Sequence, residues 1–448
     1  MQWLNIALAV LVTAAGLAAA VHALLYKRRP QAALGWIAVC LMLPILGALL
    51  YYLFGINRVQ ARARVLRGGT SAKTPVPADN KAGWTHGNDV TALHCGEEAY
   101  PAMLEAIRGA EKYVYLSTYI FGTGGVGGEF IDALADAARR GVDVRVLIDG
   151  VGELYTWPLA GRALRRRGVR VATFLPPRLV PPTVSINLRN HRKILVVDGE
   201  IGFTGGMNIA DRHLVADATR RQRVVDVHFR LVGPIVARLE EIFAADWLFT
   251  TREKLPIHEP ARRIAGAASC RVIADGPDEP RDILLGLLLR SIASAQRRVA
   301  IMTPYFLPLP ELIGVFHAAA LRGIEVDVVL PAKNNLPYVH WASRHMLWQL
   351  LVADVRIHYQ PAPFVHTKLL LVDDATAVIG SWNIDPRSLR LNFELAVEIH
   401  DRALVAHLGD HFDSARRRST TVTLADVDGR SLPERLRDGA AWLLSPYL

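Results

Sequence analysis

The chain has 448 residues, of which 51% are hydrophobic and 21% are charged. This composition excludes an intrinsically disordered protein, and the length suffices for two globular lobes. The formal net charge of +10 favours a polyanionic partner, either a nucleic acid or an anionic lipid surface. The three cysteines lie far apart in the sequence, so they predict neither a disulfide framework nor a cysteine-rich metal site.

Two long apolar runs occupy residues 1–57. They extend from Trp3 to Tyr26 and from Ala32 to about Ile56, and each exceeds the roughly 20 residues with which a helix crosses a bilayer. A signal peptide is an alternative for the first run, but its start lacks Lys and Arg. A buried helical hairpin is the other alternative, and the length of both uncharged runs argues against it. We therefore expect two transmembrane helices in 1–57, then a basic juxtamembrane segment and linker in 58–90 that favours a cytoplasmic catalytic part.

From residue 91 onward, predicted helices and strands alternate twice in the same order. The first half has predicted helices at 97–110, 128–140 and 157–167 and strands at 112–121, 142–148 and 169–175. The second half has predicted helices at 282–295, 310–322 and 341–352 and strands at 298–306, 325–330 and 355–359. This pattern predicts two similar α/β lobes, 91–255 and 256–448, with a site shared between them.

One motif occurs once in each predicted lobe. It reads H-x-K-x-x-x-x-D, with Gly seven residues after the Asp, a small residue at eight and Asn at ten. Each residue alone has an ordinary structural explanation, but six registered positions that occur twice predict a catalytic site. The members are His191, Lys193, Asp198, Gly205, Gly206 and Asn208 in the first lobe, and His366, Lys368, Asp373, Gly380, Ser381 and Asn383 in the second.

The residue types of this motif suit the chemistry of a phosphodiester. His and Lys two positions apart on a strand point to the same face, so both can address one phosphate. Two copies supply one imidazole to attack phosphorus, a second to protonate the leaving alkoxide, and two ammonium groups to stabilise the oxygens. The backbone at Gly206 and Ser381 and the side chains of Asn208 and Asn383 are candidates for holding the phosphate.

Each motif His also needs a group that fixes its tautomer. Asp226 and Glu394 are the candidates, because each lies on a predicted strand about thirty residues after the His of its own lobe. A carboxylate on one ring nitrogen would raise the basicity of the other. The alternative for each is a surface acid on a strand, and the sequence leaves it open.

At these residues the chain resembles the phospholipase D superfamily, whose signature is a doubled H-K-D motif. More narrowly, it resembles the bacterial cardiolipin synthases over essentially its whole length. The stretches that carry this resemblance include NLRNHRKILVVDG (187–199), GFTGGMNIAD (202–211) and GSWNIDPRSLRLNFEL (380–395). Two departures are Val224-Val225 before Asp226, where the family has an aromatic residue and Arg, and Trp382, where a small residue is common.

The resemblance implies two phospholipase D-like lobes around a central site and a phosphatidyltransferase activity. One phosphatidylglycerol would phosphatidylate a His and release glycerol, and a hydroxyl of a second would attack this intermediate to give cardiolipin. The resemblance assigns His191 as the nucleophile and His366 as the general acid and then base. It assigns the phosphate to Lys193, Lys368, Asn208 and Asn383, and it gives Asp198 and Asp373 a supporting role in the loops.

The implied enzyme is a multi-pass protein of the bacterial inner membrane that acts on anionic phospholipid and requires neither a metal nor another cofactor. A hydrolytic phospholipase D with the same catalytic residues is the alternative, as is phosphatidylethanolamine as a second donor. The apolar runs argue against a nuclease of the same superfamily, as does the lack of interleaved aromatic and basic residues, and nucleic acid is not an expected partner. A membrane scaffold without activity would not need two complete motifs.

Overall fold

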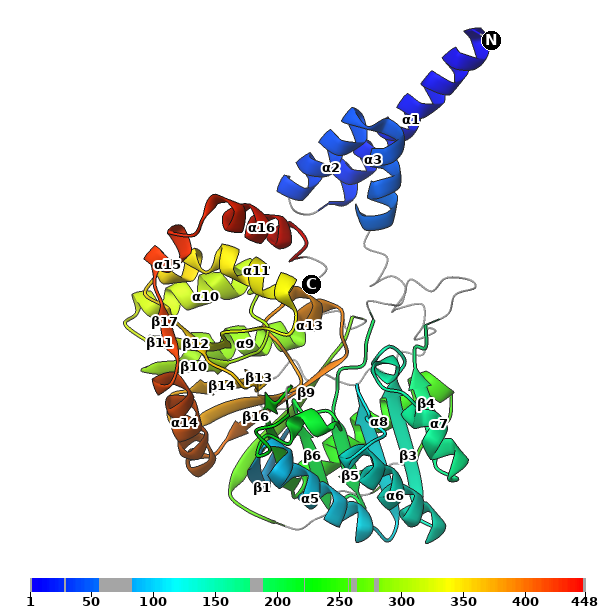
Figure 1. Ribbon diagram of the computed structural model, residues 1–448, viewed down its shortest axis with the longest axis vertical. Helices are drawn as coiled ribbons and strands as arrows, with labels where there is room; N and C mark the ends of the chain where they lie inside the picture. Colours follow the sequence, from blue (N-terminus) through cyan, green and yellow to red (C-terminus); the bar gives the residue numbers. More distant parts are fainter. Residues whose placement is uncertain are drawn as a thin grey trace. The chain divides into compact units, whose positions relative to one another are not determined.

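The computed structural model describes residues 2–27, 30–55, 83–177, 188–220, 222–256, 258, 264–277 and 282–445. It contains two compact units, a helical unit within Met1–Gly69 and an α/β unit within Thr70–Leu448. Figure 1 draws both units. The basic residues of the segment at 58–82 lie outside the described residues.

The helical unit contains one helix that is long and apolar enough to cross a membrane, among the residues described. This helix, α1 (Gln2–Tyr26), coincides with the first apolar run. The second run was predicted as one continuous span, and that prediction is wrong. It is divided into α2 (Pro30–Met42), α3 (Pro44–Leu50) and the π-helix η1 (Tyr51–Gly55). The break falls at Leu43, because Pro44 lacks an N–H group and its ring disfavours a helical conformation of the preceding residue.

Small residues bring the helices of this unit together. Ala20 and Ala23 of α1 pack on the buried Cys40 of α2. The imidazole Nδ1 of His22 lies 2.8 Å from the hydroxyl of Tyr51, so these two polar side chains are partners of each other. The remaining surface of α1 exposes apolar side chains such as Leu11, which is 68% exposed. An exposed apolar helix of this length is typical of a segment that faces lipid.

The α/β unit is built on a sheet of 15 strands. The strand order is β17-β12-β11-β10-β14-β15-β16-β9-β1-β8-β6-β5-β2-β3-β4. The first lobe contains β1 (Trp84–His94), α5 (Cys95–Arg108), β2 (Tyr113–Thr118), α6 (Val126–Arg139), β3 (Asp143–Asp149), η2 (Gly152–Tyr155), α7 (Ala160–Arg166), β4 (Arg170–Phe174), β5 (Ile194–Val197), β6 (Ile201–Gly205), η4 (Asp211–His213), β7 (Val224–Val225), β8 (Val227–Val232) and α8 (Ile235–Thr251).

The second lobe repeats this order and adds elements at its end. It contains β9 (Ala268–Asp275), α9 (Ile283–Ser294), β10 (Arg298–Met302), α10 (Pro310–Leu321), β11 (Glu325–Pro331), α11 (Pro337–Met346), α12 (Trp348–Leu351), β12 (Arg356–Gln360), β13 (Phe364–Val365), β14 (Leu369–Val372), β15 (Thr376–Gly380), α13 (Pro386–Arg390), β16 (Glu394–His400), α14 (Arg402–Arg417), β17 (Thr420–Val422), α15 (Leu424–Asp428) and α16 (Leu432–Leu443). The two α/β lobes predicted from the sequence are therefore confirmed.

The first strands of the two lobes pair with each other and make the sheet continuous. β1 pairs antiparallel with β9, with Trp84 opposite Arg271 and Asn88 opposite Ala268. β1 begins inside the stretch predicted as linker, so that prediction is wrong for Trp84 onward. Its sequence, WTHGNDVTALH, is largely polar and lacks strict alternation, since most of its side chains are only partly buried.

Alternating side chains of the motif strands enter cores on opposite faces of the sheet. Ile194 of β5 and Leu369 of β14 belong to one core that extends through both lobes and is covered by α8 and α14. Leu195 and Leu370 belong to separate cores, covered by α5 to α7 in the first lobe and by α9 to α12 in the second. Figure 1 shows this layering in the second lobe, where α14 and α9 lie on opposite sides of the strands. Both motif strands are therefore buried on both faces.

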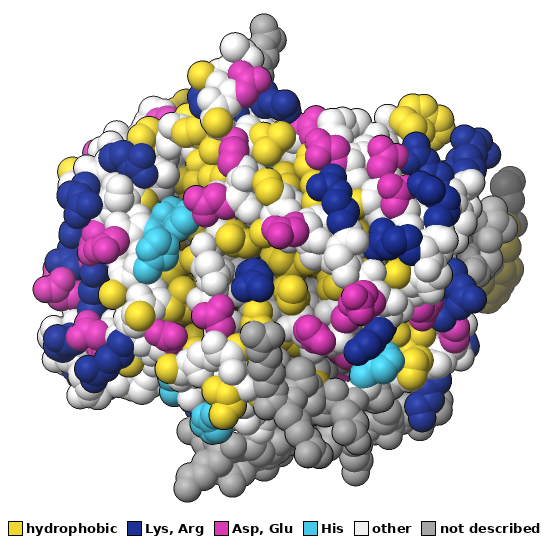
Figure 2. Space-filling model, turned by 90° about the horizontal axis from the view of Figure 1, so that it is seen from below, with side chains coloured by type: hydrophobic (Ala, Val, Ile, Leu, Met, Phe, Trp, Pro, Cys, Tyr) yellow, Lys and Arg dark blue, Asp and Glu magenta, His cyan; other side chains and the backbone are white. Residues whose placement is uncertain are grey.

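On the face of the α/β unit seen in Figure 2, basic and acidic side chains are interspersed. The positive net charge of the chain is therefore not gathered into one basic patch on this face. A nucleic-acid-binding protein would favour such a patch.

Candidate active site

Both motif histidines lie where the two lobes meet. His191 precedes β5, and its backbone N–H donates to the carbonyl oxygen of Phe393 in the second lobe, at 2.9 Å. His366 lies between β13 and β14, and its N–H donates to the carbonyl oxygen of Val225 in the first lobe, at 2.8 Å. The short strands β13 and β7 also pair across the junction. Each His is therefore fixed by the backbone of the other lobe.

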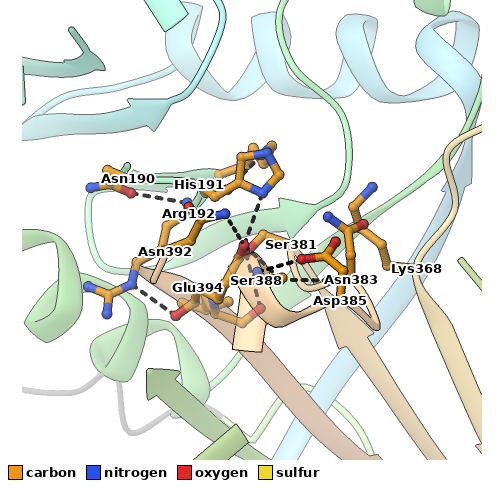
Figure 3. A network of polar contacts seen from close by, with 12 residues as sticks. Asn190, His191, Arg192, Lys368, Ser381, Asn383, Asp385, Ser388, Asn392 and Glu394 are labelled. Atoms are coloured by element: carbon orange, nitrogen blue, oxygen red, sulfur yellow. Dashed lines mark hydrogen bonds and ion pairs between the residues drawn. The ribbon is translucent and has the colours of Figure 1, made fainter. Parts of the chain in front are cut away.

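The carboxylates cross between the lobes in the same way. Nδ1 of His366 lies 2.8 Å from Oδ2 of Asp226. Nδ1 of His191 lies 3.2 Å from Oε1 of Glu394, an ion-pair distance without the alignment of a hydrogen bond; Figure 3 shows this contact. Both carboxylates are fully buried, which excludes the surface-acid alternative. The pairing of each acid with the His of its own lobe, inferred from the sequence, is wrong.

The backbone explains this crossing. Val225 and Phe393, whose carbonyl oxygens hold the two histidines, immediately precede Asp226 and Glu394. A His that bonds one residue of an extended segment brings its side chain beside the next residue of that segment. Sequence spacing alone does not contain this information, because the partner segment belongs to the other half of the chain.

Each motif Lys lies against the His that precedes it by two residues. Nζ of Lys368 lies 3.0 and 3.1 Å from the two ring nitrogens of His366 and donates to its carbonyl oxygen at 2.7 Å. Nζ of Lys193 donates to the carbonyl oxygen of His191 at 2.6 Å. Burial lowers the pKa of Lys193 to about 7 and that of Lys368 to about 8. A phosphate anion near both would restore their ammonium forms.

The charges of the two motifs act on one another. Burial is the main cause that lowers the pKa of His191, followed by Lys193, and Lys368 of the other lobe adds to the effect. Burial likewise lowers the pKa of His366, with Lys368 next and Lys193 of the other lobe contributing. Both imidazoles are therefore neutral at neutral pH. A neutral imidazole with Nδ1–H directed at a carboxylate has the lone pair of Nε2 available for bonding to phosphorus.

The two carboxylates differ in their hydrogen bonds. Glu394 accepts hydrogen bonds from the hydroxyls of Ser381 and Ser388 and from the side-chain amide of Asn392. Burial alone would raise the pKa of Glu394, but the neighbouring His191 and Lys193 and the Ser381 hydroxyl outweigh burial and lower it. Glu394 is therefore held in the ionised form.

Asp226 lacks an equivalent set of donors. Its Oδ1 accepts from the N–H of Val227, and burial raises its pKa to about 7 in spite of the nearby Lys368. Gly206 occupies the position that corresponds to Ser381, and a Cβ added there would lie 2.5 Å from Oδ2 of Asp226. The His366–Asp226 pair therefore holds a proton at neutral pH more readily than the His191–Glu394 pair does.

Several residues predicted to hold the phosphate have other partners. The N–H of Ser381 donates to the carbonyl oxygen of Leu395, so it is not free for an anion, and the prediction for its backbone is wrong. Oδ1 of Asn208 accepts from the N–H of Ile120 at 3.1 Å. Oδ1 of Asn383 is buried without a partner. Trp382 lies in the second-lobe core at 0% exposure, and its indole does not line the site.

The aspartates of the motif bond to backbone rather than to the histidines. Both adopt a left-handed conformation, with φ of 53° at Asp198 and 52° at Asp373. Their carboxylates accept hydrogen bonds from three consecutive N–H groups each, at residues 111–113 and 296–298. They tie the ends of β5 and β14 to the beginnings of β2 and β10. Among the residues that the structure describes, no group of three His, Cys, Asp or Glu could hold a metal ion.

Two tyrosines belong to the site and were not predicted. The ring centroid of Tyr119 lies 5.1 Å from that of His191, and the centroid of Tyr305 lies 6.4 Å from that of His366. β2 and β10 end before these residues, at Thr118 and Met302, earlier than predicted. The available signal was a Thr followed closely by a Tyr at the end of each strand. It reads Thr-Tyr in STYIF (117–121) and Thr-Pro-Tyr in TPYF (303–306).

Comparison with known proteins relates the whole chain to one family. Residues 103–247 and 288–416 match the family described as "Cardiolipin synthase, PLD-like domain", and residues 14–55 match "Phospholipase_D-nuclease N-terminal". A cardiolipin synthase of Oceanobacillus iheyensis is 30% identical over 99% of this chain and 97% of its own length. Cardiolipin synthase A of Pseudomonas entomophila is 32% identical over 97% of this chain and 96% of its own length.

A solved structure also has a similar fold. The phosphatidylserine synthase of Haemophilus influenzae superposes with a TM-score of 0.63 at 16% identity. The superposition covers 80% of this chain and 95% of that protein. At this identity the likeness concerns the fold alone.

Proposed function

This chain belongs to the phospholipase D-like cardiolipin synthases, and from this premise we propose that it joins two phosphatidylglycerol molecules into cardiolipin and releases glycerol. The observation that carries the proposal is the junction of the two lobes. There, the lysines of two His–Lys pairs are buried, and the charge of each Lys lowers the pKa of the His in the other pair. Each His has a carboxylate of the opposite lobe beside it. Such an arrangement suits two successive displacements at one phosphorus atom.

In the first displacement, Nε2 of His191 attacks the phosphorus of one phosphatidylglycerol. The bond from phosphorus to the glycerol oxygen breaks, and His366 gives that oxygen a proton, so free glycerol leaves. In the second displacement, His366 takes the proton from a hydroxyl of another phosphatidylglycerol. The hydroxyl oxygen attacks phosphorus, the bond to His191 breaks, and cardiolipin forms. Lys193 and Lys368 stabilise the non-bridging oxygens in both steps.

The difference between the two carboxylates supports this assignment of roles. A firmly ionised Glu394 increases the basicity of His191, as a nucleophile requires. A general acid must instead supply a proton, and the His366–Asp226 pair holds one because burial raises the pKa of Asp226 to about 7.

We further propose that the N-terminal unit crosses the bacterial inner membrane twice and leaves the catalytic unit in the cytoplasm. The length of α1 supports the first crossing, and the apolar α2 and α3 support the second, with a bend at Pro44. We expect tags at the N-terminus and at the C-terminus both to resist protease in intact spheroplasts and both to be digested in inverted vesicles. A tag pair that reports opposite sides would establish a single crossing and contradict the proposal.

The products of the purified full-length protein test the proposed function. With phosphatidylglycerol as the only lipid, we expect cardiolipin and glycerol in equal amounts by thin-layer and enzymatic analysis. Phosphatidic acid without cardiolipin would instead establish a hydrolase. Rapid quenching followed by peptide mass analysis should locate the phosphatidyl group on His191, and an adduct on His366 would reverse the two roles.

Substitution of Glu394 tests the crossed pairing. We expect Glu394→Gln to lower kcat by roughly 10²- to 10⁴-fold, because the loss of the carboxylate removes the partner that orients His191. The matched control is Glu398→Gln on the same strand, since Glu398 pairs with Arg271 away from the site. The control should retain activity near that of the wild type. Similar losses of kcat in both variants would show that a Glu→Gln change anywhere on β16 disturbs the enzyme, and would contradict a specific role of Glu394 in orienting His191.

The pKa of the lysines predicts an alkaline limit. The ammonium forms are needed, and burial lowers the pKa values of Lys193 and Lys368 to about 7 and about 8, so the free enzyme loses these charges as pH rises through this range. We expect kcat/KM for phosphatidylglycerol to fall between pH 7 and 8, while kcat falls only at higher pH, because bound phosphate favours the ammonium forms. In Lys193→Arg, which stays charged, the lower step should disappear. A kcat/KM profile that stays flat up to about pH 9 would contradict this prediction, because it would mean that both lysines titrate only near the pKa of an ordinary lysine.

A further inference from the structure

The internal repeat extends to a basic position beyond the H-K-D motif. The segment Asn-Ile-Ala-Asp-Arg ends at Arg212 and the segment Asn-Ile-Asp-Pro-Arg ends at Arg387. Both arginines follow the His of their lobe by 21 residues. Arg212 lies in η4 and Arg387 in α13. Neither residue has a role in the two displacements described above.

The guanidinium of Arg212 makes no hydrogen bond or ion pair with any residue that the structure describes. Its Nε is buried without a partner. The adjacent Asp211 is engaged elsewhere, because its carboxylate accepts from the N–H of Val126 and lies near Arg220. A guanidinium is always charged and carries five donors. A partly buried cation of this kind is stabilised when an anion such as a phosphate bonds to it.

Arg212 lies at the His366 end of the site. The ring of the next residue, His213, has its centroid 6.4 Å from that of His366. After burial and nearer groups, the positive charge of Arg212 helps to lower the pKa values of His366 and Lys368. Burial raises the pKa of Tyr305, the tyrosine that flanks His366, and the positive charge of Arg212 acts against this rise.

Arg387 occupies the corresponding place at the other end. Burial raises the pKa of Tyr119, the tyrosine that flanks His191, and the positive charge of Arg387 acts against this rise. Each lobe therefore extends one arginine toward the His of the other lobe, as it does with its carboxylate. The site has two lysines at its centre and one arginine toward each end.

The geometry of the second displacement gives these ends different roles. The attacking hydroxyl must approach phosphorus opposite the bond to His191, and it must do so beside His366, which removes its proton. An acceptor phosphatidylglycerol carries its own phosphate one glycerol away from that hydroxyl. This second anion must therefore lie beyond His366, where Arg212 offers an uncommitted guanidinium. Water and simple alcohols carry no such anion.

We propose that Arg212 binds the phosphate of the acceptor lipid and so selects a lipid hydroxyl over water. This inference rests on the proposed function, because it concerns the acceptor of the same transfer. The donor phosphate remains with the two lysines at the centre. Arg212 thus determines which molecule resolves the intermediate rather than whether the intermediate forms.

A competition between acceptors tests the inference in the full-length enzyme. Phosphatidylglycerol is supplied in mixed micelles together with ethanol, and cardiolipin, phosphatidylethanol, phosphatidic acid and glycerol are quantified. In Arg212→Gln we expect cardiolipin to fall roughly 10- to 100-fold, the effect of a lost charge-assisted contact. Glycerol release should change little, because phosphatidylethanol and phosphatidic acid together rise by the amount of cardiolipin that is lost. Arg212→Lys keeps a point charge without the planar fork and should restore part of the cardiolipin.

Two further variants serve as controls. Arg220→Gln removes a nearby arginine that pairs with Asp211 and Asp217, and it should leave the product ratio unchanged. Arg387→Gln removes the arginine at the His191 end and should not shift products from cardiolipin to phosphatidylethanol. If Arg387→Gln causes that shift instead, the acceptor enters at the other end and the inference is overturned.

The remaining outcomes separate this inference from the proposed function. Equal loss of every product in Arg212→Gln, or an unchanged yield of cardiolipin, would refute a role of Arg212 in choosing the acceptor. Both results leave the proposed function intact as long as the wild-type protein makes cardiolipin. A wild-type protein that makes phosphatidic acid alone would refute the proposed function itself.

Discussion

The site depends on a reciprocal contact between the lobes. Each motif His bonds through its backbone to a residue of the other lobe and lies, through its ring, beside the carboxylate that follows this residue. These carboxylates are fully buried, and a buried charge without a partner costs several kcal/mol. The contact therefore has a structural role as well as a chemical one, because each imidazole gives the buried acid of the other lobe a polar partner.

The same contact turns a nearly symmetric scaffold into an asymmetric site. The repeat gives both histidines an acid and a lysine, but the small residue of the motif is Gly206 in one lobe and Ser381 in the other. Burial raises the pKa of Asp226 to about 7, whereas at Glu394 the neighbouring His191 and Lys193, with the added hydroxyl of Ser381, outweigh burial and lower the pKa. Two equal histidines would compete for the same role, whereas two unequal ones can divide nucleophilic attack from proton transfer.

The sequence predicted the parts of this protein that depend on local or repeated patterns. The alternation of helices and strands located both lobes, and the registered motif located His191 and His366. The crossing of Asp226 and Glu394 was missed because it depends on contacts between distant segments, which no periodicity encodes. β1 was missed because a half-exposed central strand lacks the apolar alternation used to recognise strands. The break in the second apolar run could, by contrast, have been predicted from Pro44, because proline disrupts a continuous helix. The prediction of one continuous span considered hydropathy alone.

The unbroken sheet has a consequence for how substrates exchange. Backbone hydrogen bonds run from β17 at one edge to β4 at the other and pass through the join of β1 with β9, so opening a cleft between the lobes would break the pairing of these two strands. In the proposed reaction, both displacements then take place on one continuous sheet. In this scheme glycerol has to leave the side of phosphorus opposite His191 before the second hydroxyl can attack from that side, which gives a ping-pong order of events. The small size of the leaving alcohol is then an advantage, because glycerol can diffuse away into water while both acyl chains of the bound phosphatidyl group stay in the bilayer.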